Sequence, residues 1–197
     1  VVVYLACVVY SFLLLGGTLA MMIRWQWAFP GRKVPLLGDL FLRRTGGVLG
    51  PAEYQQLFTA HGLIMVFFAV TPVLIGAFGN FLIPLQIGAR DMAFPKLNLA
   101  SYWVYVLGAA FFIATLVLGG VDTGWTFYTP YSTTTVTTVA PVLLGAFILG
   151  MGSIVTGLNF IVTIHTLRAP GITWMRLPLF AWAMYATSVI QVLATPV

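Results

Sequence analysis

Charged residues are scarce in this chain of 197 residues: they make up 7% of the sequence, as nine lysines and arginines against four acids. Sixty per cent of the residues are hydrophobic and the mean hydropathy is +1.02, so there is too little polar surface to cover a soluble globule of this size. The sequence therefore predicts an integral membrane protein. The basic residues lie mostly in the connections between apolar runs, and because a DNA or RNA surface would need a denser basic patch, no nucleic-acid partner is expected.

Cysteine and histidine are also rare. The single cysteine, Cys7, cannot form a disulfide within the chain and gives no information about the redox compartment. Phosphate-binding loops, paired-cysteine metal motifs, the Gly-x-Ser-x-Gly motif and the His-Glu-x-x-His motif are absent from the sequence. The polar feature that most needs an explanation is His61, at the mouth of a long apolar run.

Several apolar runs are long enough to span a membrane, because a bilayer core of roughly 30 Å needs about 20 helical residues. Five spans are predicted, at about 1–23, 56–83, 99–119, 138–166 and 178–197. The first run has no cleavage-site pattern and no initiating Met, so we interpret it as a span in a chain whose true start is missing. No internal repeat or soluble domain is evident, and residues 1–197 are expected to form one all-α transmembrane bundle domain.

The connections between these runs carry turn signals. Pro30-Gly31 and Gly46-Gly47 mark turns in the first connection, and Pro84 and Gly88 are expected to break the helical pattern of the second span. The connections on one side of the predicted bundle hold five basic residues and those on the other side hold four. This difference is too small for the positive-inside rule to decide the orientation.

An imidazole inside a membrane helix is costly, so His61 is expected to have a partner. An iron-porphyrin is one partner that suits it. A hydrogen bond to a neighbouring helix or a buried water is another, and histidines also line proton paths and substrate sites. Gly62 beside it is compatible with a flat macrocycle lying close, but glycine is common in membrane helices. The local sequence leaves these alternatives open.

A row of polar residues follows one face of the fourth predicted span: Ser153, Thr156, Asn159 and Thr163, spaced by three, three and four. Such a row either bonds a neighbouring helix or faces a wet cavity that holds a chain of waters. A second polar group lies where the second span ends and the third begins, and it comprises Asn80, Asp91, Asn98 and Ser101. His61 and Asn80 are separated by about 28 Å of helix at 1.5 Å per residue, so the two features are expected near opposite membrane faces.

Two further polar residues lie near span ends. Arg24 closes the first predicted span, where it either snorkels to the interface or is held by an ion pair, a lipid head group or a polar substituent of a cofactor. His165, near the end of the fourth span, is interpreted as an interfacial residue without an assigned role, because no other residue at metal-ligand spacing accompanies it.

Several segments resemble subunit I of the haem-copper terminal oxidases. They are Thr59-Ala60-His61-Gly62, Gly79-Asn80, Pro84-Leu85-Gln86-Ile87-Gly88-Ala89-Arg90-Asp91-Met92-Ala93-Phe94-Pro95, Gly124-Trp125 and Arg168-Ala169-Pro170-Gly171-Ile172-Thr173-Trp174. The resemblance runs nearly end to end over helices I to V of that subunit. Its most specific part is the segment around Asp91, which resembles the branch whose proton channel begins at that residue.

The resemblance implies roles for individual residues. His61 would be one axial ligand of the low-spin haem iron, Arg24 would touch a ring substituent of the same haem, and Trp125 would lie near its propionates. Asp91 would be the proton entrance on the cytoplasmic or matrix side, which places the His61 end outward. The narrow neck of the proton path and its further polar steps would be formed by Asn80, Asn98, Ser101, Ser153 and Asn159.

The resemblance also implies what this chain does not supply. In the family, the second low-spin ligand, the high-spin haem ligand, the copper-binding histidines and the cross-linked tyrosine all lie after the fifth helix. The chain is therefore expected to be an N-terminal fragment of a subunit of about twelve helices, without the oxygen-reducing site. A high-spin haem and copper are expected from the remaining part.

Two points stay open in the sequence: which molecule donates the electrons, and whether the protein is an oxidase or a transporter. Members that oxidise quinol carry Arg and Asp on helix I where this chain has Leu15 and Leu19, which favours cytochrome c, whereas the segment from Pro84 to Asp91 is very similar to the quinol branch. The expected function is that of a proton-pumping cytochrome c oxidase. It would work with subunits II and III in a bacterial inner membrane, or in the mitochondrial inner membrane of a eukaryote. The alternative from another class is a cofactor-free membrane transporter or channel.

Overall fold

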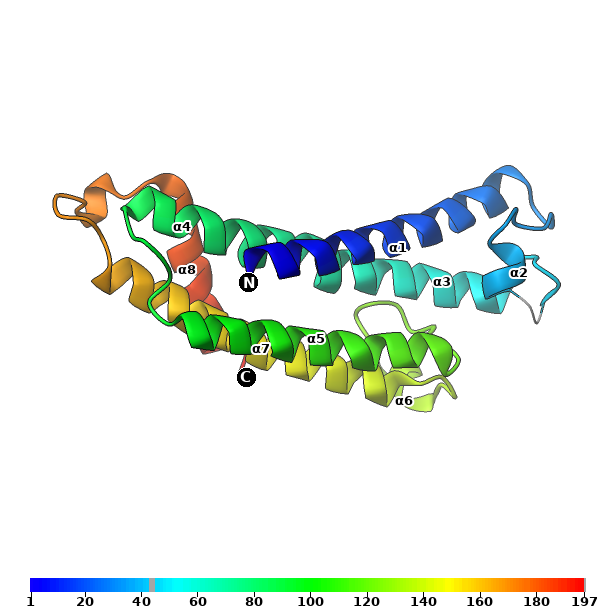
Figure 1. Ribbon diagram of the computed structural model, residues 1–197. Coiled ribbons are helices and arrows are strands. Elements are labelled where there is room, and N and C mark those ends of the chain that lie inside the picture. The colour runs from blue at the N-terminus through cyan, green and yellow to red at the C-terminus, as the bar shows by residue number, and fades with distance from the viewer. Residues whose placement is uncertain (43–44, 197) are drawn as a thin grey trace.

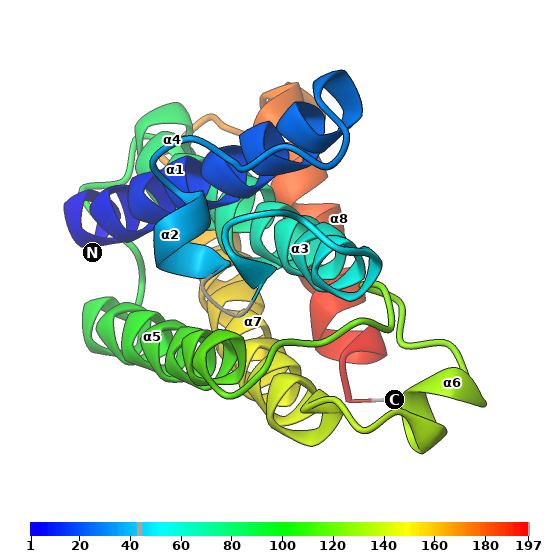
Figure 2. The same cartoon turned by 90° about the vertical axis from the view of Figure 1, so that its right-hand side faces the viewer.

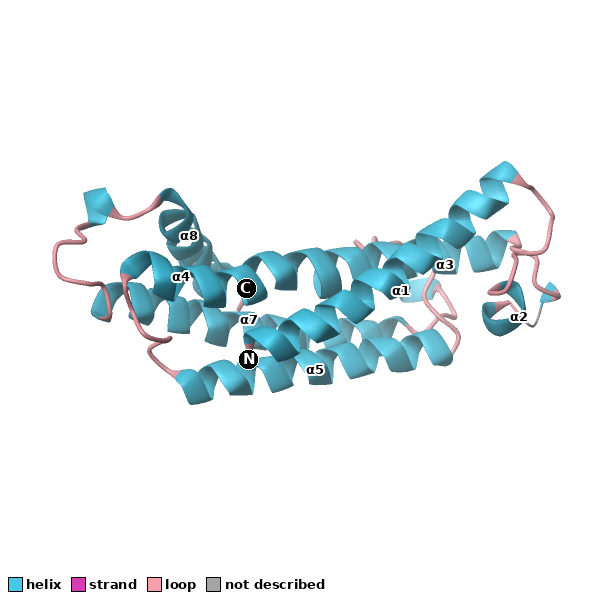
Figure 3. Cartoon of the chain, turned by 45° about the horizontal axis from the view of Figure 1, so that its top comes forward, coloured by secondary structure: helices cyan, strands magenta, loops and turns pink. Residues whose placement is uncertain are grey.

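The computed structural model describes residues 1–42 and 45–196. Within these ranges the regular structure is entirely helical (Figure 3). The elements in chain order are α1 (Val2–Ala28), α2 (Gly38–Phe41), α3 (Pro51–Leu63), the π-helical η2 (Ile64–Val70) and η3 (Pro72–Gly79), α4 (Asn80–Ile87), α5 (Pro95–Val117), α6 (Tyr131–Thr134), α7 (Val139–Thr166), the 3-10 turn η4 (Trp174–Arg176) and α8 (Leu179–Ala194).

Four helical segments are long and apolar enough to cross a membrane: α1, the continuous run Pro51–Ile87, α5 and α7. They confirm the predicted all-α transmembrane fold and match the first four predicted spans. The fifth predicted span corresponds to α8, a shorter apolar helix of 16 residues. Position 197, where that span was predicted to end, lies outside the described residues.

The long helices run side by side (Figure 1). α1 packs antiparallel against the second span, α5 pairs with α7, and α8 packs against α7 and α4. The end-on view shows α1 and α3 on one side of the bundle and α5 and α7 on the other (Figure 2). Where α5 crosses α7, a Cβ added to Gly108 or to Gly145 would lie 3.0 Å from the backbone oxygen of the other glycine. Small residues at this crossing thus allow the two backbones to approach closely.

Two helix ends differ from the prediction. α1 continues to Ala28 instead of ending at residue 23, and its last turn is tied to α3 by the Trp27 indole N–H, which donates to the Tyr54 hydroxyl at 2.9 Å. The prediction that Pro84 breaks the second span is wrong, because Pro84 lies buried inside α4. The helix ends instead at Gly88, whose φ of 73° is a left-handed conformation that glycine adopts at little cost.

The middle of the second span is π-helical around Pro72. Proline has no backbone N–H, so it cannot donate to the Phe68 carbonyl four residues earlier. The Tyr105 hydroxyl on α5 donates to that carbonyl at 3.0 Å. A carbonyl without a donor is expensive in a membrane, and this bond gives the Phe68 carbonyl a donor while it ties α5 to the second span.

We expect Tyr105→Phe to lower the free energy of unfolding by about 1 kcal/mol, because the Phe68 carbonyl loses its donor. Pro72→Ala restores a backbone N–H, so the tyrosine change should cost less in that background. Detergent unfolding of the full-length protein, the two single variants and the double variant measures the cost of Tyr105→Phe in each background. Equal costs in the two backgrounds would show that the hydroxyl does not substitute for the missing N–H.

Candidate functional site

His61 lies in the last turn of α3 and faces α1. Its Nδ1 is 2.9 Å from the Gly16 carbonyl oxygen. A carbonyl only accepts hydrogen bonds, so Nδ1 carries the proton and Nε2 keeps its lone pair. Within the described residues Nε2 has no hydrogen-bond partner, and this is the tautomer and orientation of a metal-binding histidine whose other nitrogen is held by a backbone carbonyl.

Gly16 permits this bond, and the prediction from sequence missed it. A Cβ at Gly16 would lie 2.8 Å from the Met65 sulfur and 3.0 Å from the Ile64 Cγ2. A larger residue would therefore push α1 away from the turn that carries His61. Glycine at this position brings the accepting carbonyl within reach of the imidazole.

Trp125 comes to the same turn from the connection between α5 and α7. The Gly124 N–H donates to the Thr59 hydroxyl at 3.0 Å, which anchors this connection on α3. A Cβ at Gly62 would lie 3.5 Å from the Trp125 Cδ1, so the indole lies against the residue that follows His61. The tryptophan remains 46% exposed and can contact a further group.

Arg24 lies on α1, eight residues after Gly16 and toward the same end of the bundle as the start of α3. It is exposed, and it makes no hydrogen bond or ion pair within residues 1–42 and 45–196. By helix geometry it lies about 12 Å beyond Gly16 along α1 and about 80° around the axis. Its guanidinium is available to an anionic or polar partner.

These residues fit one axial position of a haem. An imidazole with a free Nε2, a glycine beside it, a half-exposed tryptophan and an unpaired guanidinium are suitable neighbours for a macrocycle. In the described part of the chain no three histidine, cysteine, aspartate or glutamate side chains gather as they would in a metal cluster.

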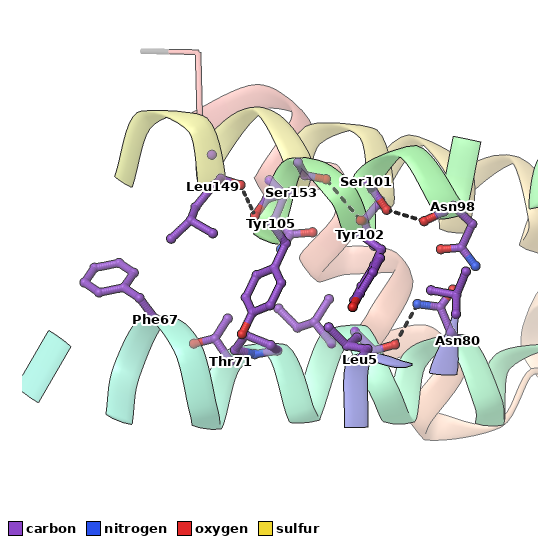
Figure 4. Close-up of a pocket in the computed structure, with 18 of the residues that line it drawn as sticks. Leu5, Phe67, Thr71, Asn80, Asn98, Ser101, Tyr102, Tyr105, Leu149 and Ser153 are labelled. Carbon is purple, nitrogen blue, oxygen red and sulfur yellow. Dashed lines mark hydrogen bonds between the residues drawn. The ribbon is translucent and has the colours of Figure 1, made fainter. Parts of the chain in front are cut away.

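A cavity of about 280 Å³ lies between the second span, α5, α7 and α8 (Figure 4). Four of the predicted proton-path residues line it: Asn80, Asn98, Ser101 and Ser153. The sequence placed them on three different helices, and the structure brings them together. Other polar side chains in the wall are Thr71, Tyr102, Tyr105, Thr156 and Gln191. At about 30 Å³ per water, the space suits a chain of roughly nine waters.

Three hydroxyl groups of this wall use their protons within the protein. Ser101 donates to the Asn98 carbonyl at 2.8 Å, Ser153 to the Leu149 carbonyl at 3.1 Å, and Thr156 to the Gly152 carbonyl at 3.0 Å. They therefore present only acceptor lone pairs to the cavity. The Asn80 amide donates to the Gly76 carbonyl at 2.6 Å, while its buried oxygen has no partner among the described residues. Such a group normally binds water.

The polar row on α7 divides into two parts. Ser153 and Thr156 line the cavity, whereas Asn159 and Thr163 hold the connection that carries Asp91. The Asn159 side chain accepts from the Phe94 N–H at 3.0 Å and donates to the Phe94 carbonyl at 3.3 Å. Thr163 accepts from the Ala93 N–H at 2.9 Å. Asn159 thus lies outside the cavity, and its predicted role as a polar step of the path stays a prediction.

Asp91 is exposed at the end of the molecule where α4 leads into α5. Its Oδ1 accepts from the Met92 N–H at 2.7 Å. Because Ala93 and Phe94 are held by α7, the segment that carries Asp91 is fixed against that helix. The His61 turn lies toward the other end of the second span, as the spacing predicted (Figure 1).

The family model described as "Cytochrome C and Quinol oxidase polypeptide I" matches residues 1–197. The chain belongs to this family. The resemblance found in the sequence is confirmed, and the four long apolar helices together with family membership indicate an integral membrane protein.

Individual relatives of this oxidase subunit I include both kinds of oxidase. The chain is 42% identical over 189 residues to cytochrome c oxidase subunit 1 of Thermostichus vulcanus, which covers 95% of this chain and 32% of that protein. It is 41% identical over 192 residues to the probable cytochrome c oxidase subunit 1-beta of Nocardia farcinica, covering 95% and 30%. It is 40% identical over 186 residues to quinol oxidase subunit 1 of Bacillus subtilis, covering 92% and 26%. The chain thus spans about a third of the length of these relatives or less.

The other histidine of this oxidase chain, His165, lies in an aromatic cluster at the Asp91 end. Its Nε2 is 2.8 Å from the Tyr185 hydroxyl, and its ring is edge-on to Trp174 at 5.0 Å. The Arg168 guanidinium lies 4.0 Å from the centre of a Trp174 ring. Aromatic residues and cations of this kind are typical of a membrane interface, which agrees with the interfacial position predicted for His165.

Asp122 organises the connection that carries Trp125. Its carboxylate accepts from the Tyr131 hydroxyl at 2.6 Å, the Thr137 hydroxyl at 2.9 Å and the Thr135 hydroxyl at 3.1 Å. Partial burial raises the pKa of Asp122, but hydrogen bonds from these three hydroxyls lower it by more, so its pKa lies below the ordinary value of 3.8. The threonine-rich run thus has a structural role that its composition did not reveal.

The lowered pKa of Asp122 predicts an acid-sensitive connection. A carboxylate with a depressed pKa in the folded state stabilises the fold above its unfolded pKa, and this contribution disappears as the pH falls through the folded pKa. We therefore expect residues 118–138 to exchange amide hydrogens faster below about pH 3.8, relative to the helices, than at pH 7. In Asp122→Asn, residues 118–138 should exchange their amide hydrogens quickly relative to the helices at both pH values. Equal pH dependence in the two proteins would contradict the assignment.

Proposed function

We propose that the complete subunit is the catalytic subunit of a proton-pumping terminal oxidase. It passes electrons from cytochrome c through a low-spin haem on His61 to a haem-copper centre, where oxygen is reduced to water. The observation that carries the proposal is the bond between His61 Nδ1 and the Gly16 carbonyl, which leaves Nε2 available to iron. His61 lies toward the opposite end of the second span from Asp91, and this separation supports separate electron and proton functions.

At the outer end, the residues of this chain hold and surround the cofactor. His61 would hold the haem iron through Nε2, and the Gly16 carbonyl keeps the imidazole in the required tautomer. Trp125 would shield one side near the propionates, and Arg24 would meet a polar ring substituent. When bound, the haem supplies one-electron transfer. The Thr59 hydroxyl accepts from the Gly124 N–H and in this way keeps Trp125 in place.

At the inner end, residues of the chain would take up protons and guide them into the membrane. The exposed Asp91 carboxylate collects a proton from the cytoplasm or matrix, and the cavity residues hold waters that carry it inward. Asn80 and Asn98 form the neck, and the hydroxyl oxygens of Ser101 and Ser153 accept hydrogen bonds from the waters. Asn159 acts mainly by holding the Phe94 backbone, and in this way it positions the segment that carries Asp91.

The partners of the proposed enzyme follow from the family. Subunits II and III, oxygen and the lipid bilayer are proposed partners, and the remaining part of subunit I would supply the high-spin haem and the copper site. The proposed location is the inner membrane of a bacterial cell, or the mitochondrial inner membrane in a eukaryote. The four long apolar helices support the membrane setting.

Cytochrome c is the proposed electron donor. Leu19 is 3% exposed and belongs to the apolar core, and Leu15 packs against that core. The chain therefore has an apolar stretch at the positions where quinol-oxidising members carry Arg and Asp. A quinol donor is the second candidate, and it is supported by the segment from Pro84 to Asp91 and by the 40% identity to quinol oxidase subunit 1 of Bacillus subtilis.

Oxygen uptake by the purified full-length complex distinguishes the two donors. The proposal predicts rapid uptake with reduced cytochrome c and slow uptake with ubiquinol at equal enzyme concentration. The opposite order would assign the complex to the quinol oxidases.

A further inference from the structure

Gln191 is the one amide on helix α8, which is mostly apolar, and no role follows for it from the sequence pattern. It lines the cavity, and its Oε1 is buried without a hydrogen-bond partner among the described residues. A buried amide without a partner costs roughly 1–3 kcal/mol in proteins. An amide in this position is therefore expected to bind water from the cavity.

The packing of α8 on α7 determines where this amide lies. A Cβ at Gly157 would lie 3.1 Å from the Ser188 carbonyl oxygen and 3.3 Å from the Gln191 Oε1. Glycine at position 157 thus lets the two helices approach, and it places the Gln191 amide against α7 within one turn of Thr156. Gln191 lies about 18 Å along α8 from Leu179, which corresponds to the middle of the membrane.

The donors in the cavity wall show what Gln191 adds. The hydroxyls of Ser101, Tyr105, Ser153 and Thr156 all donate to backbone carbonyls and offer only acceptors to water. The side-chain amides of Asn98 and Gln191, both in the wall, make no hydrogen bond within residues 1–42 and 45–196. Asn98 lies one turn from the start of α5, close to the Asp91 end. Gln191 supplies the corresponding N–H donors and an acceptor in the middle of the membrane.

We propose that Gln191 is a further water-holding residue of the proton path, one that positions waters beyond Ser153 and Thr156. This inference rests on the proposed function, because it extends the path that begins at Asp91. The hydroxyls of Ser101, Ser153 and Thr156 can only accept from a water, because their protons are already used, whereas the Gln191 amide can donate to one water and accept from the next. Gln191 is a positioning residue, since the transferred proton moves through the waters and the amide is not consumed.

The test uses the full-length oxidase reconstituted in vesicles, with Gln191→Leu compared with the wild type. Proton uptake and turnover should both slow by about tenfold, which corresponds to about 1.4 kcal/mol. The solvent deuterium isotope effect on turnover should rise. Reduction of the low-spin haem by the electron donor should keep its rate, which a general disturbance of the fold would not allow. Gln191→Asn, which keeps the amide, should recover much of the uptake.

Leu193→Ala is the matched control, because Leu193 lies on the same helix, is 68% exposed and does not line the cavity. If Gln191→Leu fails to assemble, Gln191→Met keeps the chain length without the amide and is measured in the same way. Wild-type uptake in the apolar variant, together with blocked uptake in Asp91→Asn, would overturn this inference and leave the proposed function standing. Unchanged uptake in Asp91→Asn would overturn the proposed path itself.

Discussion

A His61→Leu form of the full-length oxidase subunit is expected to lose the absorption spectrum of its low-spin haem. Leucine has a similar volume to histidine but no lone pair, so the change removes the iron ligand while filling the same space. His61 Nε2 is the candidate ligand at this end of the bundle, and the Gly16 carbonyl fixes its tautomer. The reduced-minus-oxidised spectrum of the purified variant measures the loss.

The control for this change is His165→Leu, which removes the other histidine, in the aromatic cluster at the far end of the bundle. It should keep the low-spin spectrum. Gly16→Ala tests the supporting carbonyl, because the added Cβ would meet the Met65 sulfur at 2.8 Å and displace α1. This variant should keep the haem and shift its midpoint potential. If His61→Leu retained a six-coordinate low-spin haem, the assignment of His61 would be wrong.

Replacing Asp91 by asparagine should reduce turnover and proton pumping together, by on the order of 100-fold, as expected when a positioned acid-base group is removed. Asparagine is nearly the same shape, and its oxygen can still accept the Met92 N–H that holds the aspartate side chain. The variant therefore keeps the local bond and loses only the group that takes up a proton. Proton uptake by vesicles, followed with a pH-sensitive dye during oxygen reduction, provides the measurement.

Asp39→Asn is a suitable control for Asp91→Asn, because Asp39 pairs with Lys33 in the connection at the opposite end of the bundle. It removes the same charge from the protein but not from the Asp91 end of the bundle, and it should leave proton uptake at the wild-type rate. Unchanged uptake in Asp91→Asn would contradict the role of this residue as the entrance.

The positions of the membrane helices could be predicted because the length of an apolar run decides whether it spans a bilayer. The ends were less predictable, since tertiary contacts decide them. The Trp27 indole bonded to Tyr54 extends α1, and a packed helix tolerates Pro84 where the local rule predicted a stop. The bond from Tyr105 to the Phe68 carbonyl beside the π-helical turns involves another helix, so helical spacing could not predict it, although a proline in the middle of a span signals a missing backbone N–H.

The site could be predicted in part. Asn80, Asn98, Ser101 and Ser153 line one cavity, and their roles in a proton path stay predictions. Helical spacing placed Asn159 on the same face as Ser153, but spacing does not say what faces each turn of a helix. The backbone of Phe94 occupies the position beside Asn159, so the side chain holds a connection and lies outside the cavity. Residues such as Gly16 and Gln191 could not be found from spacing, because their roles depend on neighbouring helices.

The absorption spectrum of the purified full-length protein tests the central claim most directly. The proposed oxidase should be red, with a Soret band in the oxidised state, and dithionite should produce the sharp visible bands of a reduced low-spin haem. Those bands should be missing from His61→Leu and present in His165→Leu. A colourless wild-type protein that still carried ions across vesicles would contradict the account and would favour a cofactor-free transporter.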